Sequence, residues 1–201
     1  MVRIKSAYHH GDLRKALLAA AEAELDEKGL EGFSLRGVAR RAGVSHAAPA
    51  HHFKDTAAML TALATVAAER LTRSLRKHRD LAGKDARDRI VASGVGYVSF
   101  ALENPALFKL LFGSERPDSD DPELVEQAAR AFQILTDDLA ELRGNDPMAE
   151  EEGTLDTAAL WSAVHGIASL LIANRMRFLG PMLAEDRDAT LARLIRRTLP
   201  R

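Results

Sequence analysis

Apolar residues recur along this chain at intervals of three and four positions, which is the period of one face of an α-helix. The strict alternation of a half-buried strand is almost absent. The spacing predicts nine helices, three short ones followed by six longer ones, over residues 13–28, 35–42, 45–52, 56–79, 85–103, 105–112, 122–143, 155–178 and 185–199. Because good helix formers dominate these segments, the sequence predicts an all-α fold.

Small polar residues and glycines mark the expected ends of these helices. Ser34, Ser45 and Asp55 each precede an apolar-periodic segment, where a side-chain oxygen can cap the first backbone N–H groups. Gly29 and Gly43 follow two of the segments and favour the left-handed backbone that closes a helix. Loops are expected at residues 113–121, 144–153 and 180–181.

The composition is that of an ordinary globular protein, with 46% hydrophobic and 28% charged residues among 201. The chain holds no cysteine, which excludes a disulfide framework, a thiolate metal centre and a cysteine nucleophile. No secretory signal is visible, and the longest apolar run, Trp161 to Ala173, is shorter than the roughly 18 residues of a membrane span. We therefore expect a cytoplasmic protein without a membrane partner.

Residues 34–53, SLRGVARRAGVSHAAPAHHF, combine two short predicted helices with a tight turn. Leu35 and Val38 would bury one face of the first helix, Gly43 would keep the turn thin, and Phe53 would anchor the end of the second helix. This pattern is typical of a helix-turn-helix, whose second helix enters the major groove of DNA. A helical hairpin without DNA-binding activity fits the periodicity equally well.

Several segments resemble the N-terminal domain of TetR-family repressors. They are Tyr8–Arg14 (YHHGDLR), the connection Gly29–Ser34, and Ala42–Phe53 (AGVSHAAPAHHF). Farther along, Leu160–Gly166 (LWSAVHG) resembles the Trp–His–Gly signature of one C-terminal branch of the family. The detailed resemblance covers about the first 60 residues and the region of Trp161, while helix number and length agree over the whole chain.

The resemblance implies a helix-turn-helix DNA-binding domain over residues 1–55 and a helical-bundle domain for ligand binding and dimerisation over residues 56–201. It also implies a homodimeric repressor that binds a near-palindromic operator in double-stranded DNA and is released by a small-molecule effector. No enzymatic activity, cofactor or metal is expected.

The expected DNA contacts are Ser34, Arg36, Ser45, His46, Ala47, Ala48, His51 and Lys54. The two serines would present helix N-termini to phosphates, the basic residues would add charge, and the alanine methyl groups suit the methyl group of thymine. Arg3 and Lys5 would extend as a basic arm. Two departures from the family pattern, Ala50 in place of an aromatic residue and Thr56 in place of lysine, remove expected phosphate contacts.

The large side chains of the second half suggest a ligand pocket in the helical core. Its expected residues are Tyr97, Phe100, Phe108, Phe112, Phe132, Trp161 and His165. Core packing without a ligand explains the same aromatic residues. Apolar stripes on the last two helices favour a two-fold dimer interface. Its expected residues are Leu160, Val164, Ile167, Ala168, Leu171, Leu191, Leu194 and Ile195.

Three other interpretations stay open at this point. An enzyme is disfavoured because the nucleotide-binding, hydrolase and metalloprotease motifs are absent. The pairs His9-His10 and His51-His52 suit a metal poorly, because adjacent helical residues point about 100° apart. A helical module that binds a protein, and a DNA-binding activator without an effector, both agree with the sequence.

Overall fold

The computed structural model describes residues 10–199, and over those residues every regular element is a helix. The expected arm of Arg3 and Lys5 lies outside the described residues. The elements are α1 (His10–Gly32), α2 (Leu35–Arg41), the 3-10 helix η1 (Ala48–His51), α3 (Thr56–Arg79), α4 (Ala86–Glu103), α5 (Pro105–Gly113), α6 (Pro122–Arg143), α7 (Glu151–Ile172), the 3-10 helix η2 (Arg177–Leu179), α8 (Gly180–Glu185) and α9 (Arg187–Arg196). The prediction of an all-α fold is confirmed.

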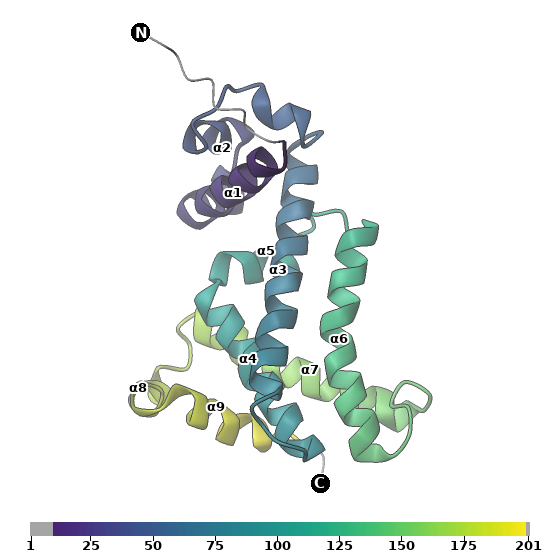
Figure 1. Ribbon diagram of the computed structural model, residues 1–201. Coiled ribbons are helices and arrows are strands. Elements are labelled where there is room, and N and C mark those ends of the chain that lie inside the picture. Colours follow the sequence, from purple (N-terminus) through teal and green to yellow (C-terminus); the bar gives the residue numbers. More distant parts are fainter. Residues whose placement is uncertain (1–9, 200–201) are drawn as a thin grey trace.

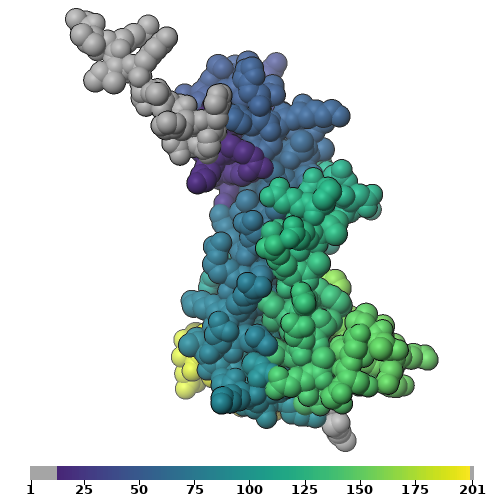
Figure 2. Space-filling model, turned by 45° about the vertical axis from the view of Figure 1, so that its right-hand side comes forward, coloured from purple at the N-terminus to yellow at the C-terminus, as the bar shows by residue number. Residues whose placement is uncertain are grey.

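A small N-terminal lobe of α1, α2 and η1 stands at one end of a larger helical body (Figure 1). Helix α3 starts in this lobe and runs down through the body, where it packs against α4 and α6. Helices α7 and α9 pack against α4 at the far end of the body. In the space-filling view the lobe projects above the body as a separate mass (Figure 2).

The signals expected to start and stop the first helices are largely confirmed. The Ser34 hydroxyl accepts from the Gly37 N–H at 3.1 Å, and the Asp55 carboxylate accepts from the Ala58 N–H at 2.8 Å. Gly29 and Gly43 both adopt a left-handed φ, at 63° and 67°. At Gly29 the helical path of α1 breaks, and the helix then continues as far as Gly32.

The predicted α-helix over residues 45–52 is wrong, because the structure has a 3-10 turn from Ala48 to His51. The Ala48 N–H donates to the Ser45 carbonyl at 3.0 Å, which is a bond between residues three apart. Pro49 carries no N–H and cannot continue an α-helical ladder at this point. The segment begins after Ala47 and has no side-chain cap, so the expected cap at Ser45 is also absent.

The last two predicted helices also differ from the structure. Helix α7 begins at Glu151 and ends at Ile172, followed by Asn174 with a φ of 55°. Gly153 was expected in a loop but lies in α7, where a Cβ would stand 2.3 Å from the Pro147 carbonyl oxygen. The final predicted helix, 185–199, corresponds to α9, which is shorter because Asp186 is extended and caps it through the Ala189 N–H at 3.0 Å, and the expected loop at 180–181 instead begins the short helix α8.

One hydrophobic core extends from α1 through α3 and α4 to α9. At the end of the body farthest from the lobe, a fully buried carboxylate joins three helices. Asp138 on α6 accepts from Arg79 at the end of α3 and from Arg89 on α4, at 2.7 and 2.8 Å. Because both oxygens are bonded to a guanidinium, the buried charge is compensated, and α3, α4 and α6 are held in register.

Candidate DNA-binding surface and ligand cavity

All eight residues expected to contact DNA lie in the N-terminal lobe, at the start of α2 or between α2 and α3. Ser34, Arg36, Ser45, His46, Ala47, His51 and Lys54 are exposed, and Ala48 is half-buried. None of the eight is part of the hydrophobic core. The lobe therefore presents the predicted serines, histidines and basic residues to solvent, although the second helix of the motif is a 3-10 turn.

A buried carboxylate fixes the orientation of α2 against α1. Glu24 on α1 is 2% exposed and accepts from the Arg41 guanidinium at 2.6 Å. It lies under Gly37, where a Cβ would overlap its carboxylate. Arg41 also donates to Glu27, and this hydrogen bond lowers the pKa of Glu27 to about 2. Arg41 is thus bonded within the lobe, whereas Arg36 on the same helix is exposed.

Two sets of contacts connect the lobe to the body. Arg70 on α3 forms a two-pronged ion pair with Glu22 on α1, at 2.5 and 2.6 Å, and reaches Asn104 at 3.3 Å. In addition, Arg116 in the loop between α5 and α6 donates to the Leu30 carbonyl near the end of α1. This loop therefore contacts the lobe directly.

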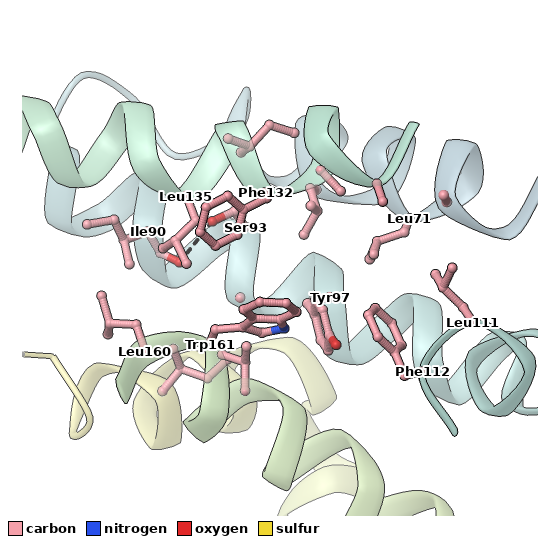
Figure 3. Close-up of a pocket in the computed structure, with 18 of the residues that line it drawn as sticks. Leu71, Ile90, Ser93, Tyr97, Leu111, Phe112, Phe132, Leu135, Leu160 and Trp161 are labelled. Atoms are coloured by element: carbon pink, nitrogen blue, oxygen red, sulfur yellow. Dashed lines mark hydrogen bonds between the residues drawn. The ribbon is translucent and has the colours of Figure 1, made fainter. Parts of the chain in front are cut away.

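A cavity of about 380 Å³ lies in the body between α3, α4, α6 and α7. Figure 3 shows aromatic side chains entering it from several helices, with Tyr97 on α4, Phe112 at the end of α5, Phe132 on α6 and Trp161 on α7. These four residues were predicted from the sequence. Among the described residues that line the cavity, none is Asp, Glu, Lys, Arg or His.

Three predicted pocket residues lie elsewhere. Phe100 and Phe108 are 1% and 4% exposed and belong to the packed core, so they do not line the cavity. His165 lies behind the cavity wall, where its Nδ1 is 2.9 Å from the Tyr97 hydroxyl and its ring stacks on Phe108. Helix periodicity places an aromatic residue on a helix face but does not say which part of the core is hollow.

Tyr97 and His165 form a neutral polar pair. Burial raises the pKa of Tyr97 above its usual value, and a hydrogen bond with Trp161 opposes this only in part. Burial also lowers the pKa of His165. Both shifts favour the uncharged form of each group at neutral pH. The wall of the cavity therefore offers hydrogen-bonding groups without a formal charge.

Sequence reasoning missed the aliphatic wall of the cavity. Leu71 and Leu75 on α3, and Leu124 and Ala128 on α6, line it together with the aromatic residues. Their apolar spacing was visible in the sequence, but it also fits a packed helix. Which residues line an open space depends on the distance between α6 and α7, and apolar spacing in the sequence does not give that distance.

The eight residues expected at a dimer interface pack inside the protomer. Leu160, Ile167, Ala168, Leu191 and Ile195 are buried, and Val164, Leu171 and Leu194 pack against the same core. The apolar stripes of α7 and α9 face α4, so the five buried side chains are covered within the protomer, while Val164, Leu171 and Leu194 are half-buried. The opposite face of α7 is exposed and includes Leu155, Ser162 and Leu170.

Helix α7 is also long and apolar enough to cross a membrane, by length and composition only. This is weak support for a membrane span, because a helix that packs in a soluble protein passes the same test. Over residues 10–199, no group of three or more His, Asp or Glu side chains is placed to hold a metal ion.

The fold and site define a helical regulator with a helix-turn-helix lobe and a hollow helical body. Two family models match: "Bacterial regulatory proteins, tetR family" over residues 17–63, and "Tetracyclin repressor-like, C-terminal domain" over residues 90–198. The chain belongs to the TetR family of transcription regulators, with an N-terminal DNA-binding and a C-terminal ligand-binding domain.

Solved structures share this fold. A protein of unknown function from Rhodococcus sp. RHA1 is 32% identical, with a TM-score of 0.78 over 98% of this chain and 100% of that one. The TetR-family regulator PfmR from Thermus thermophilus is 23% identical, with a TM-score of 0.64 over 92% and 99% of the two chains. A TetR-family regulator from Marinobacter aquaeolei is 17% identical, with a TM-score of 0.66 over 92% and 94%. No curated protein matches the chain.

Proposed function

We propose that this protein is a cytoplasmic transcriptional repressor that binds a near-palindromic operator as a homodimer and is released by a small-molecule effector. One observation carries the proposal: α3 serves both sites. Its capping residue Asp55 follows Lys54 on the exposed DNA side, and farther along the same helix Ala68, Leu71 and Leu75 line the cavity. We place the boundary between the two domains, 1–55 and 56–201, at the start of this helix.

The loop between α5 and α6 would carry the signal from cavity to lobe. Ser119 in this loop lines the cavity. One residue earlier, the Asp118 N–H donates to the Thr61 hydroxyl on α3 at 2.9 Å, and Arg116 donates to the Leu30 carbonyl on α1. A ligand that displaces Ser119 would shift both contacts. Release then follows if the ligand prefers the state in which the two lobes are wrongly spaced for DNA.

The outer face of α7 is our candidate for the dimer interface. Only 22% of the most apolar 18-residue window of this helix is buried in the protomer, although its mean hydropathy is 1.4. The exposed face bears Leu155 and Leu170 beside the small residues Ser162 and Gly166, which allow close helix approach. In the proposed dimer, a two-fold pairing of α7 would place the η1 segments of the two lobes about 34–36 Å apart, which is the length of one helical turn of DNA.

In the proposed complex, the exposed side chains of the lobe contact DNA. Ser34 presents the N-terminus of α2 to a phosphate, with Arg36 and Lys54 beside it, and His46 and Ala47 meet base edges. Ala50 and Thr56 occupy the positions at which relatives of the Trp–His–Gly branch carry an aromatic residue and a lysine. If the chain belongs to that branch, as we propose, its DNA affinity is lower for lack of these phosphate contacts.

The test is a fluorescence-anisotropy titration of the purified full chain against its own upstream intergenic DNA, with scrambled DNA as control, at two salt concentrations. The repressor proposal expects selective binding, two protomers per site, weaker binding to both DNAs for Arg36→Ala, and a loss of selectivity for His46→Ala. Arg73→Ala is a matched control, because Arg73 is exposed on α3 in the body. Equal and weak binding to both DNAs would overturn the proposal in favour of a module that binds a protein.

A further inference from the structure

We propose that the cavity selects an uncharged, largely apolar ligand of two or three rings and rejects compounds that carry a carboxylate, sulfonate or ammonium group. This inference rests on the proposed function only in taking the cavity as the effector site. It goes further by naming the chemical class of the ligand and the side chains of the cavity that select this class.

The cavity offers no counter-charge. Among the lining side chains within residues 10–199, the only titratable one is the Tyr97 phenol, which burial keeps protonated. A charged ligand that enters would lose its hydration shell and find no opposite charge in the wall. The cost of such a transfer is large unless the ion is paired. An uncharged ligand meets no such penalty.

Two polar groups of the wall are already hydrogen-bonded within the protein. The Ser93 hydroxyl donates to the Ile90 carbonyl at 3.0 Å, and the Tyr97 hydroxyl is 2.9 Å from His165 Nδ1. The bonded serine and tyrosine do not depend on a ligand for their hydrogen bonds. Affinity must therefore come mainly from apolar contact, which grows with the area removed from water.

Two aromatic rings from opposite helices contact each other in the cavity wall and offer apolar area to a ligand. Phe132 on α6 and Trp161 on α7 lie with ring centroids 5.5 Å apart, and Trp161 is 42% exposed (Figure 3). The indole therefore forms part of both the cavity wall and the surface. The volume of about 380 Å³ lies at the lower end of the range of about 300–1,000 Å³ for small-molecule sites, which suits two or three rings.

A charged ligand has a different place to bind on this protein. On α3 and α6 a separate polar groove has four basic residues in its lining and two acidic ones, namely Arg73, Arg76, Lys77 and Arg130 with Glu69 and Asp80. An anion attracted to the protein would be held there by exposed guanidinium groups, outside the cavity. The cavity should therefore prefer uncharged ligands and the groove should prefer anions. Two probes that differ only in charge can distinguish the two sites.

The experiment compares two fluorescent probes on the full chain. N-phenyl-1-naphthylamine is neutral, and 8-anilino-1-naphthalenesulfonate has the same rings with an added sulfonate. Trp161 is the single tryptophan of the sequence and lines the cavity, so quenching of its emission reports a bound probe, and variants of the cavity wall locate that probe. We expect the neutral probe to bind at least tenfold more tightly and to quench Trp161 at saturation.

A pair of variants assigns the binding to the cavity. Ala128→Phe fills it from α6, whereas Ala129→Phe adds the same ring next to it, at an exposed residue that does not line the cavity. The neutral probe should lose at least tenfold in affinity with the first variant and little with the second. Because both alanines are exposed, both variants should fold.

Four outcomes are informative. The inference would be overturned if the sulfonated probe bound more tightly than the neutral one and lost affinity in Ala128→Phe. It would also be overturned if Ala128→Phe left the affinity for the neutral probe unchanged. Sulfonate binding that ignores Ala128→Phe but weakens in Arg76→Gln supports it, because the anion is then in the groove. If the neutral probe binds as expected but leaves operator binding unchanged, the ligand class stands and the effector role in the proposed function fails.

Discussion

At Gly96, α4 passes so close to α3 that a Cβ would stand 2.6 Å from the Ser74 carbonyl oxygen. The two backbones are tied at the same point, because the Ser74 hydroxyl donates to the Gly96 carbonyl at 2.8 Å. Gly96→Ala must therefore separate the helices, and we expect it to lower the free energy of unfolding by about 1–3 kcal/mol. Urea denaturation measures the change. Gly113→Ala, with open space around its Cβ, is the control and should cost little.

His165 should make the stability of the body dependent on pH. Because burial lowers its pKa in the folded protein, the unfolded chain binds a proton at a higher pH than the folded chain does. The stabilising contribution of the neutral ring is therefore complete above the ordinary histidine pKa of about 6.5 and is lost as the pH falls through the lower folded-state value. We expect the thermal midpoint of the protein to fall more between pH 7 and pH 5 than that of His165→Phe. Parallel curves for the two proteins would contradict this.

Local signals in the sequence predicted single residues well wherever only neighbours in the chain matter. The cap at Ser34 and the left-handed Gly43 depend on the few residues around them, and both are confirmed. Gly96 gave no such signal, because the Ser74 carbonyl group that leaves no room for a Cβ there belongs to a residue 22 positions away that folding brings close. The prediction of aromatic pocket residues was likewise only partly correct, because Tyr97 lines the cavity while Phe100 is packed in the core away from it.

At the scale of elements, apolar periodicity located the helices but not their type or partners. Residues 45–52 have helical composition, yet Pro49 turns the segment into a 3-10 helix. The apolar stripe of α7 was visible in the sequence, but it does not state whether α4 or a second chain covers it. The structure assigns that stripe to α4 and leaves the opposite face exposed.

The loop between α5 and α6 gives the element-scale prediction. If its contact with Leu30 transmits ligand binding to the lobe, Arg116→Ala should leave ligand affinity unchanged and reduce the effect of ligand on operator affinity. We expect the ratio of operator affinities without and with ligand to fall at least threefold, measured by anisotropy at saturating ligand. Arg130→Ala removes an exposed arginine of α6 that pairs only with Glu126 in the same helix, and serves as control. An unchanged ratio in Arg116→Ala would rule out this route.

For the whole molecule, the relation between two protomers determines whether two lobes can reach one operator. Leu170 and Leu155 lie on the outer face of α7 and are 46% and 55% exposed, so a partner that covers this face would bury both. Leu170→Glu should leave the protomer folded, because the side chain stands outside the core, but should place a charge in the proposed interface. We expect the protein to sediment as a monomer at micromolar concentration.

The matched control is Leu81→Glu, which makes the same substitution at a leucine that is 81% exposed beyond the end of α3. This variant should remain a dimer. Since linking two binding units raises avidity by about 10²–10⁴ without a new contact, Leu170→Glu should also weaken operator binding about a hundredfold or more, while its weak binding to a half-site persists. A variant that stays dimeric and binds the operator normally would move the interface to another face of the body. Monomeric protein with full operator affinity would instead mean that a single lobe suffices to read the DNA.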